Sequence, residues 1–173
     1  MHMYMTCTCS SVEHHYKKRA YVLLDEQLTW DEANDRCKEG DNAYLAVAND
    51  YKIFKFLRGM YDEYVANGGS ANGVWIDGKY YPLTDTWQCD SNSNNNVYEY
   101  EDICQYDMPW SHREPNRLDT EHCILVWYSR RDGVANYRCN ARMPAICATK
   151  RYVLLLLYGP STLSLTRELV RVF

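Results

Sequence analysis

The sequence predicts an α+β domain with two helices, small antiparallel sheets and a long loop region stabilised by disulfides. Two segments carry apolar residues at the three- and four-residue spacing of amphipathic helices. Several short runs rich in Val, Ile, Leu and Tyr, bounded by turn residues, are typical of strands. Eight cysteines among 173 residues indicate disulfides and an oxidising compartment.

The first half of the domain supplies one strand and two capped helices. Residues 19–27 are rich in Val, Leu and Tyr and are expected to form a strand. The helix that follows begins with a capping box, Thr29 and Glu32, and Gly40 is placed to end it. A second helix is expected at residues 49–65, where an Asn-Asp pair can cap an apolar stripe.

The second half alternates short strands with an irregular segment. An apolar strand at residues 74–78 ends in an Asp-Gly turn. Residues 79–117 show little regularity, and a segment of this length is usually functional or held by cross-links. Residues 123–129 are strongly β, and residues 134–140 and 143–149 are expected to be the closing strands.

The two ends of the chain are expected to lie outside the domain, which spans residues 19–149. Residues 1–18 are an N-terminal arm without a periodic pattern. The tail, residues 150–173, contains the run YVLLLLY, which is too short for the roughly 20 residues of a membrane span. The tail is either an amphipathic helix that packs on the domain or on a partner, or sequence without a native role.

Charge and cysteine chemistry exclude other classes of function. A net charge of −4 argues against nucleic acid as the main partner, because phosphate binding needs a basic face. Cys7-x-Cys9 followed by His14-His15 has donor atoms for zinc but matches no strong zinc spacing. Disulfides imply a secreted, extracellular protein, although residues 1–15 contain no apolar signal-peptide core. An incomplete N-terminal sequence is the preferred explanation.

A short polar stretch, REPNRLDTEHC, carries the clearest functional signal. It places Glu114, Asn116 and Glu121 close together and ends in Cys123. Calcium is a hard cation that takes six to eight oxygen ligands from carboxylates, amide carbonyls and water. The stretch therefore has the donors of a calcium site, but a polar surface loop can also carry such residues by accident.

Several landmarks in this order and spacing resemble the C-type lectin-like domain family. The resemblance covers about residues 19–149. The landmarks are Trp30-x-x-Ala33-x-x-x-Cys37, Leu45-Ala46, WIDG at Trp75–Gly78, Trp87, Trp110 before Glu114-Pro115-Asn116, Cys123, Cys139 and Cys147. The family's two disulfides imply Cys37–Cys147 and Cys123–Cys139 in this chain. Cys89 and Cys104 remain in the domain, and we infer that they form a third, local bridge.

The resemblance implies that the polar stretch binds calcium and sugar. In sugar-binding members the Glu and Asn of EPN coordinate calcium and bind sugar hydroxyls, roles that fall here to Glu114 and Asn116. A cis peptide before Pro115 would turn both side chains to one side. Glu121 matches the next calcium ligand. EPN in this family accompanies mannose-type sugars.

One family motif is changed in this chain. The calcium-binding Trp-Asn-Asp triplet is replaced by Val134, Ala135 and Asn136, so that Asn136 alone keeps a ligand oxygen. Calcium affinity should fall, because it depends on ligand charge and number, unless Asp132 folds back to compensate. Exchanging Ala135→Asn together with Asn136→Asp is expected to restore affinity. The family's accessory calcium site is expected to be absent, because Arg117 and His122 occupy its positions.

The resulting prediction is a secreted lectin without enzymatic activity that binds mannose-type glycans through one Ca²⁺. His112 stands near Glu114, but nothing nearby offers a nucleophile. The expected metal ligands are Glu114, Asn116, Glu121 and Asn136, and the same residues with Pro115 are expected to contact the sugar. Two alternatives remain: a calcium-independent protein-binding module of the same fold, and a structural matrix protein such as the perlucin-like lectins.

Overall fold

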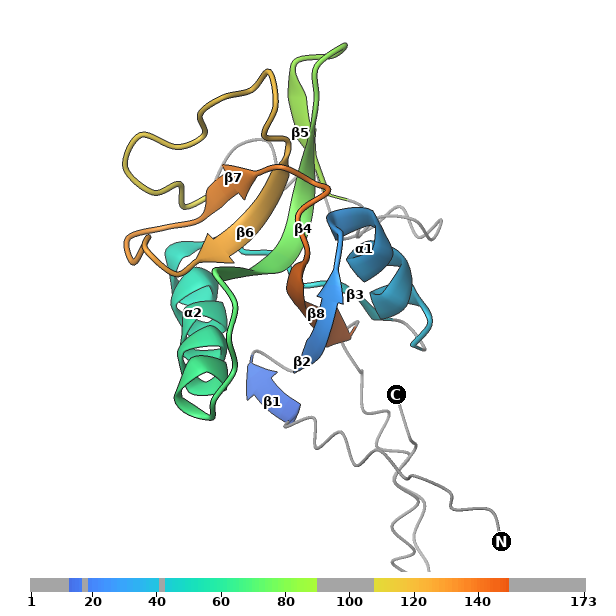
Figure 1. Ribbon diagram of the computed structural model, residues 1–173, viewed down its shortest axis with the longest axis vertical. Helices are drawn as coiled ribbons and strands as arrows, with labels where there is room; N and C mark the ends of the chain where they lie inside the picture. Colours follow the sequence, from blue (N-terminus) through green and yellow to red (C-terminus); the bar gives the residue numbers. More distant parts are fainter. Residues whose placement is uncertain (1–12, 17–18, 41–42, 90–107, 150–173) are drawn as a thin grey trace, which may run out of the picture.

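The computed structural model describes residues 13–16, 19–40, 43–89 and 108–149. In these ranges the chain forms one mixed sheet with the strand order β1-β2-β8-β4-β6-β7, while β3 pairs with β8 and β5 pairs with β4. The elements are β1 (Glu13–Tyr16), β2 (Arg19–Leu28), α1 (Trp30–Lys38), β3 (Ala43–Leu45), α2 (Tyr51–Ala66), β4 (Gly73–Tyr81), β5 (Thr86–Gln88), β6 (Cys123–Trp127), β7 (Ala135–Tyr137) and β8 (Met143–Thr149). The two helices lie on opposite sides of the strands (Figure 1).

Both helices begin where the sequence predicts. In α1 the Thr29 hydroxyl accepts a hydrogen bond from the Glu32 amide, and the Glu32 carboxylate accepts one from the Thr29 amide, which confirms the capping box. In α2 the Asp50 carboxylate caps the Ile53 amide at 2.7 Å. The start of each helix is therefore set by local hydrogen bonds and does not depend on tertiary contacts.

Strand β4 separates two apolar clusters. Its side chains alternate, so that Val74 and Ile76 belong to the cluster under α2 while Trp75 belongs to the cluster under α1. The indole N–H of Trp30 donates to the Ile76 carbonyl, and that of Trp75 donates to the Leu28 carbonyl, each at 2.9 Å. Both buried indoles are thus satisfied, and α1 and β2 are aligned on the central strand.

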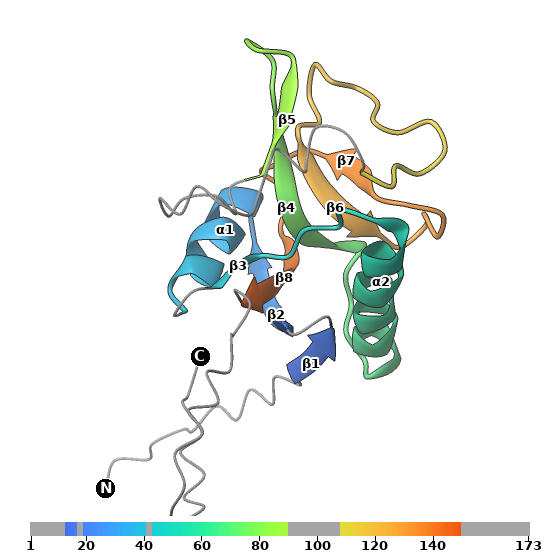
Figure 2. The same ribbon diagram turned by 180° about the vertical axis from the view of Figure 1, so that it is seen from behind.

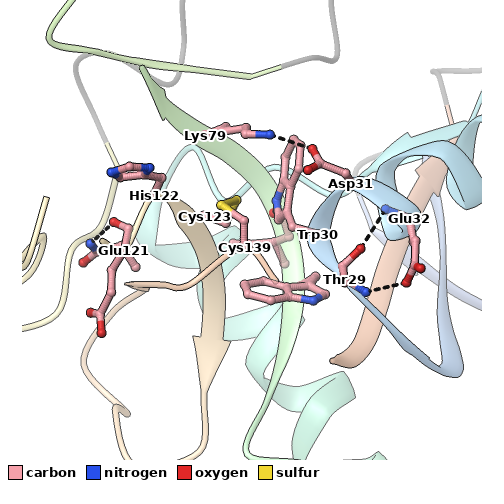
Figure 3. Close-up of a disulfide and its surroundings, with 12 residues drawn as sticks. Thr29, Trp30, Asp31, Glu32, Lys79, Glu121, His122, Cys123 and Cys139 are labelled. Carbon is pink, nitrogen blue, oxygen red and sulfur yellow. Dashed lines mark hydrogen bonds and ion pairs between the residues drawn. A yellow bond between two sulfur atoms is a disulfide. The ribbon is translucent and has the colours of Figure 1, made fainter. Parts of the chain in front are cut away.

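Two disulfides have the pairing that the family resemblance implies. Cys37–Cys147 joins α1 to β8 across 110 residues of sequence. Cys123–Cys139 joins β6 to the segment after β7 across 16 residues and lies beside Trp30 (Figure 3). Cys89 is also disulfide-bonded, but its predicted partner Cys104 lies outside the described residues, so that pairing stays a prediction. The predictions for Cys7, Cys9 and the tail also lie outside them.

The sheet contains more strand than the sequence indicates. Residues 13–16, assigned above to a loose arm, form β1 and pair with β2, so the domain boundary at residue 19 stays a prediction. In the segment expected to be irregular, β4 continues to Tyr81 and β5 returns along it as a hairpin. The closing strand expected at residues 134–140 is limited to Ala135–Tyr137.

The two ends of the described domain lie together, far from the polar loop. Tyr21 pairs with Ala148, and the Ala20 amide donates to the Thr149 hydroxyl at 3.1 Å. Figure 2 shows β1 and the end of β8 at one end of the molecule and the yellow loop beside β7 at the other. Within the described ranges, neither helix is long and apolar enough to cross a membrane.

Candidate functional site

The loop that carries the EPN triplet is attached to a second loop through backbone contacts. Trp110 forms a parallel bridge with Val134, and the Ser111 amide donates to the Val134 carbonyl at 2.9 Å. Gly133 lies at the crossing of the two loops. A Cβ atom there would lie 2.2 Å from the Pro109 carbonyl oxygen, so the close approach requires glycine.

Asp132 fixes the entrance of the EPN loop. One carboxylate oxygen accepts from the Ser111 hydroxyl at 2.5 Å and the other accepts from the His112 amide at 2.9 Å. These two hydrogen bonds lower the pKa of Asp132 below its usual value. The turn therefore folds back, as considered above, but both oxygens of Asp132 are used to hold residues 111 and 112.

The EPN triplet itself has the predicted backbone. The Glu114–Pro115 peptide is cis. The residues on either side, Arg113 and Arg117, have positive φ angles of 66° and 46°, which non-glycine residues seldom adopt. The Asn116 side-chain amide donates to Oε2 of Glu114 at 2.8 Å. Glu114 and Asn116, the two residues expected to bind calcium and sugar, are thus held together.

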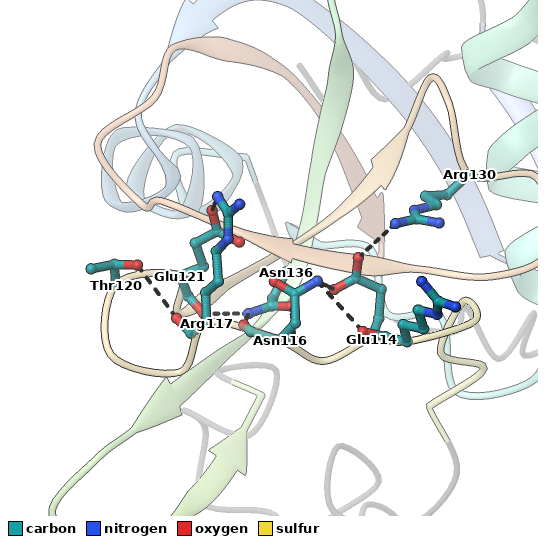
Figure 4. A network of polar contacts seen from close by, with 8 residues as sticks. Glu114, Asn116, Arg117, Thr120, Glu121, Arg130 and Asn136 are labelled. Atoms are coloured by element: carbon teal, nitrogen blue, oxygen red, sulfur yellow. Dashed lines mark hydrogen bonds and ion pairs between the residues drawn. The ribbon is translucent and has the colours of Figure 1, made fainter.

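Asn136 connects this loop to β7. Its Nδ2 donates to the Asn116 and Glu121 carbonyls, each at 2.5 Å, and its Oδ1 accepts from the Asn116 amide at 2.9 Å (Figure 4). The side chain is fully buried. Asn136 thus lies among the other predicted ligands, with its amide engaged at both ends by the backbone. Its role as a calcium ligand stays a prediction.

Ala135 lies on the other face of the same strand. It is fully buried in the apolar cluster under α1, together with Trp75 and Leu125. An asparagine at this position would place an amide among apolar side chains, which is costly without partners. An aspartate at position 136 would also lose the hydrogen bonds that Nδ2 donates. The expectation that the double exchange restores calcium affinity therefore does not fit this geometry.

Each carboxylate of the predicted calcium site lies next to an arginine. The Glu114 side chain is 0% exposed, and its Oε1 is 3.5 Å from Nη2 of Arg130. Burial raises the pKa of Glu114, and the charge of Arg130 acts in the opposite direction. Oε1 of Glu121 is 3.5 Å from Nη1 of Arg117, whose side chain is 70% exposed. The Arg117 pair is therefore well screened by solvent.

The residues present fit a weak calcium site. Oε1 of Glu114 is buried and has no hydrogen-bond partner, as expected of a ligand atom that awaits a cation. Asn116 and Glu121 belong to the same network, because the Asn136 side chain hydrogen-bonds the backbone carbonyls of both. The described part of the chain contains no group of three or more His, Cys, Asp or Glu side chains that could hold a metal. Low ligand charge is typical of low calcium affinity.

Two arginines of this site were not found from the sequence. Arg130 lies in a turn without a motif, and its contact with Glu114 depends on the tertiary fold. Arg58 belongs to α2 and is almost fully buried. It donates to the carbonyls of Trp127 and Arg130 at 2.9 Å and to that of Tyr128 at 3.3 Å. In the sequence, Arg58 could have been noticed as a basic residue on the apolar face of the predicted second helix.

Aromatic rings pack side by side next to the loop. Trp110 packs against Trp87 with ring centroids 4.9 Å apart, and Tyr80 contacts both Trp87 and His122. A ring nitrogen of His122 lies 3.0 Å from the Leu118 carbonyl. His122, at a position expected to belong to the accessory calcium site, thus has a structural contact in this chain.

Known proteins match this chain over most of its length. The family described as Lectin C-type domain matches residues 26–149. Lithostathine from Rattus norvegicus is 24% identical over 147 residues, covering 83% of this chain and 79% of that protein. The crystal structure of human lithostathine has a TM-score of 0.65 at 17% identity, covering 83% of this chain and 91% of the other. The Ca²⁺-independent C-type lectin SPL-2 from Saxidomus purpuratus has a TM-score of 0.60 at 14% identity, covering 79% and 89%.

Proposed function

The chain belongs to the C-type lectin domain family, and from this membership we propose that it is a secreted, mannose-type lectin that binds glycans at the EPN loop. Its role is binding, and we propose no reaction. The observation that carries the proposal is the fully buried Glu114 carboxylate, one oxygen of which has no hydrogen-bond partner. A buried carboxylate needs positive charge beside it, because burying a charge is costly, and the side of Glu114 that Arg130 faces is therefore a place where a cation is favoured.

Glu114, Asn116 and Glu121 would hold the calcium ion in this proposal. When bound, the ion would supply direct coordination to sugar hydroxyls. The bond from Asn116 to Oε2 of Glu114 sets these two side chains relative to each other before any ligand arrives. Asn136 holds the backbone at Asn116 and Glu121 at once, so the loop has little ordering entropy left to lose on binding.

Affinity chromatography on mannose–agarose tests the proposal. We expect the protein to be retained in millimolar calcium and to be released by a chelator, because few charged ligands give calcium dissociation constants of about 10⁻⁴–10⁻³ M. Glu114→Gln and Glu121→Gln should each reduce retention. Lys52→Gln, an exposed change on α2, should not. Equal retention of all four proteins would place sugar binding elsewhere.

Calcium-independent recognition of a protein ligand is the second candidate. It is favoured by the two arginines beside the predicted ligands, Arg130 at Glu114 and Arg117 at Glu121. SPL-2, a relative in fold, is described as Ca²⁺-independent. If the protein fails to bind mannose–agarose with or without calcium, this candidate is preferred. A matrix role would instead appear as a change in the rate of mineral growth.

A further inference from the structure

We infer that Arg130 supplies, from within the chain, the positive charge that Glu114 needs, so that Arg130 and calcium compete for this carboxylate. The inference rests on the proposed role of Glu114 as a calcium ligand and describes how that site is regulated. The ion pair with Arg130 keeps the loop geometry although the ligand set is incomplete. The native arginine therefore limits calcium affinity.

The need for a cation follows from the burial of Glu114. Its side chain is 0% exposed, and Oε1 has no hydrogen-bond partner. An isolated buried carboxylate is strongly unfavourable, and nearby positive charge relieves the cost. Arg130 Nη2 lies 3.5 Å from that same oxygen, and the arginine side chain is only 35% exposed. The atom left for calcium is therefore the atom that Arg130 faces.

Arg130 is held in this position by the fold. The buried Arg58 on α2 donates to the Arg130 carbonyl at 2.9 Å and also binds the two carbonyls at the end of β6. The guanidinium of Arg130 lies 6.0 Å from the ring centroid of Trp127. Because its backbone and side chain are both supported, Arg130 contacts Glu114 at a lower entropic cost than a free surface arginine would.

The other predicted ligand positions contribute few free oxygen atoms that could offset the cost of displacing Arg130 from Glu114. Ala135 contributes no side-chain oxygen, and the Asn136 amide is engaged by the loop backbone. Glu121 is itself paired with Arg117 at 3.5 Å. A divalent cation must therefore separate at least one carboxylate–arginine pair to gain its two charged ligands.

The test compares Arg130→Gln with Arg131→Gln, an exposed neighbour whose exchange removes the same charge. Thermal unfolding in a chelator and isothermal titration with CaCl₂ are measured for the parent and both variants. We expect Arg130→Gln to melt at a lower temperature in the chelator and to bind calcium about tenfold more tightly, since one competing charge is removed. Arg131→Gln should match the parent in both measurements.

A double variant, Glu114→Gln with Arg130→Gln, controls for general damage to the fold. It has neither the buried charge nor its partner, so it should melt at a higher temperature in the chelator than Arg130→Gln alone and should not bind calcium at this loop. If Arg130→Gln binds calcium no more tightly than Arg131→Gln, or if the double variant melts no higher than Arg130→Gln, the inference is wrong. Both readouts are independent of sugar, so loss of mannose binding would count against the proposed function alone.

Discussion

Asn136 holds the EPN loop through three hydrogen bonds to its backbone, which no sequence motif indicates. We predict that Asn136→Asp lowers the free energy of unfolding by about 2–5 kcal/mol in a chelator, because it removes two donated hydrogen bonds and places a carboxylate against two carbonyl oxygens. Urea unfolding measures this change. Asn140→Asp, an exposed exchange nearby, should be neutral. Equal stability of the two variants would show that Asn136 does not hold the loop.

Gly133 gives a second prediction at this scale. Gly133→Ala should destabilise the protein by at least about 2 kcal/mol, because the new Cβ would meet backbone atoms of Pro109 and Ser111 that cannot move independently. Gly59→Ala is the matched control: it lies in α2 with open space around it. There alanine should instead add about 0.5–1 kcal/mol through helix propensity. Thermal melts of both variants should therefore shift in opposite directions.

Whether a residue of the candidate site could be predicted depends on how far it lies in the sequence from a recognisable motif. The proximity of Glu114, Asn116 and Glu121 could be predicted because they share one short motif, and that of Asn136 because it lies three residues before a landmark cysteine; their roles as ligands stay predictions. Arg130 could not be predicted, because its approach to Glu114 depends on the turn that Arg58 fixes from another element. The role of Asn136 as a backbone clamp also depends on where the loop lies.

At the scale of elements, α2 acts on the site through one side chain. We predict that Arg58→Gln lowers the free energy of unfolding by about 3 kcal/mol, because it removes donors to the carbonyls of Trp127, Tyr128 and Arg130, at the last residue of β6 and in the turn after it. Amide hydrogen exchange should accelerate at residues 128–130 in particular. Lys52→Gln on the exposed side of the same helix should change neither quantity. An Arg58→Gln protein with unchanged exchange there would contradict the anchoring role.

The elements differ in how well the sequence predicts them. Helices α1 and α2 could be placed because their caps are local, at Thr29 and Asp50. Strand β1 could not, because EHHY has no periodic pattern and is held by β2 and by stacking of Tyr16 on Phe56. The hairpin of β4 and β5 could not be predicted either, because its pairing depends on the rest of the sheet and not on an apolar run in the sequence.

At the scale of the whole molecule, the two disulfides should differ in their effect on stability. Replacing Cys37 and Cys147 with serine should cost about 4–5 kcal/mol, and replacing Cys123 and Cys139 about 3 kcal/mol, because the first pair closes 110 residues and the second 16. Denaturant unfolding of the two double variants measures the difference. The reverse order would mean that strain or residual structure outweighs loop entropy in this protein.

The meeting of Ala20 and Thr149 at one end of the molecule determines how the lectin can be displayed. These two residues lie at one edge of the domain, and the EPN loop lies at the opposite end of the molecule (Figures 1 and 2). Copies tethered at this edge would therefore present their EPN loops in the same direction. If the loop binds glycans as proposed, a branched glycan that reaches two loops would meet the second at an effective concentration in the millimolar range. Under that proposal, firm adhesion would result from several individually weak sites.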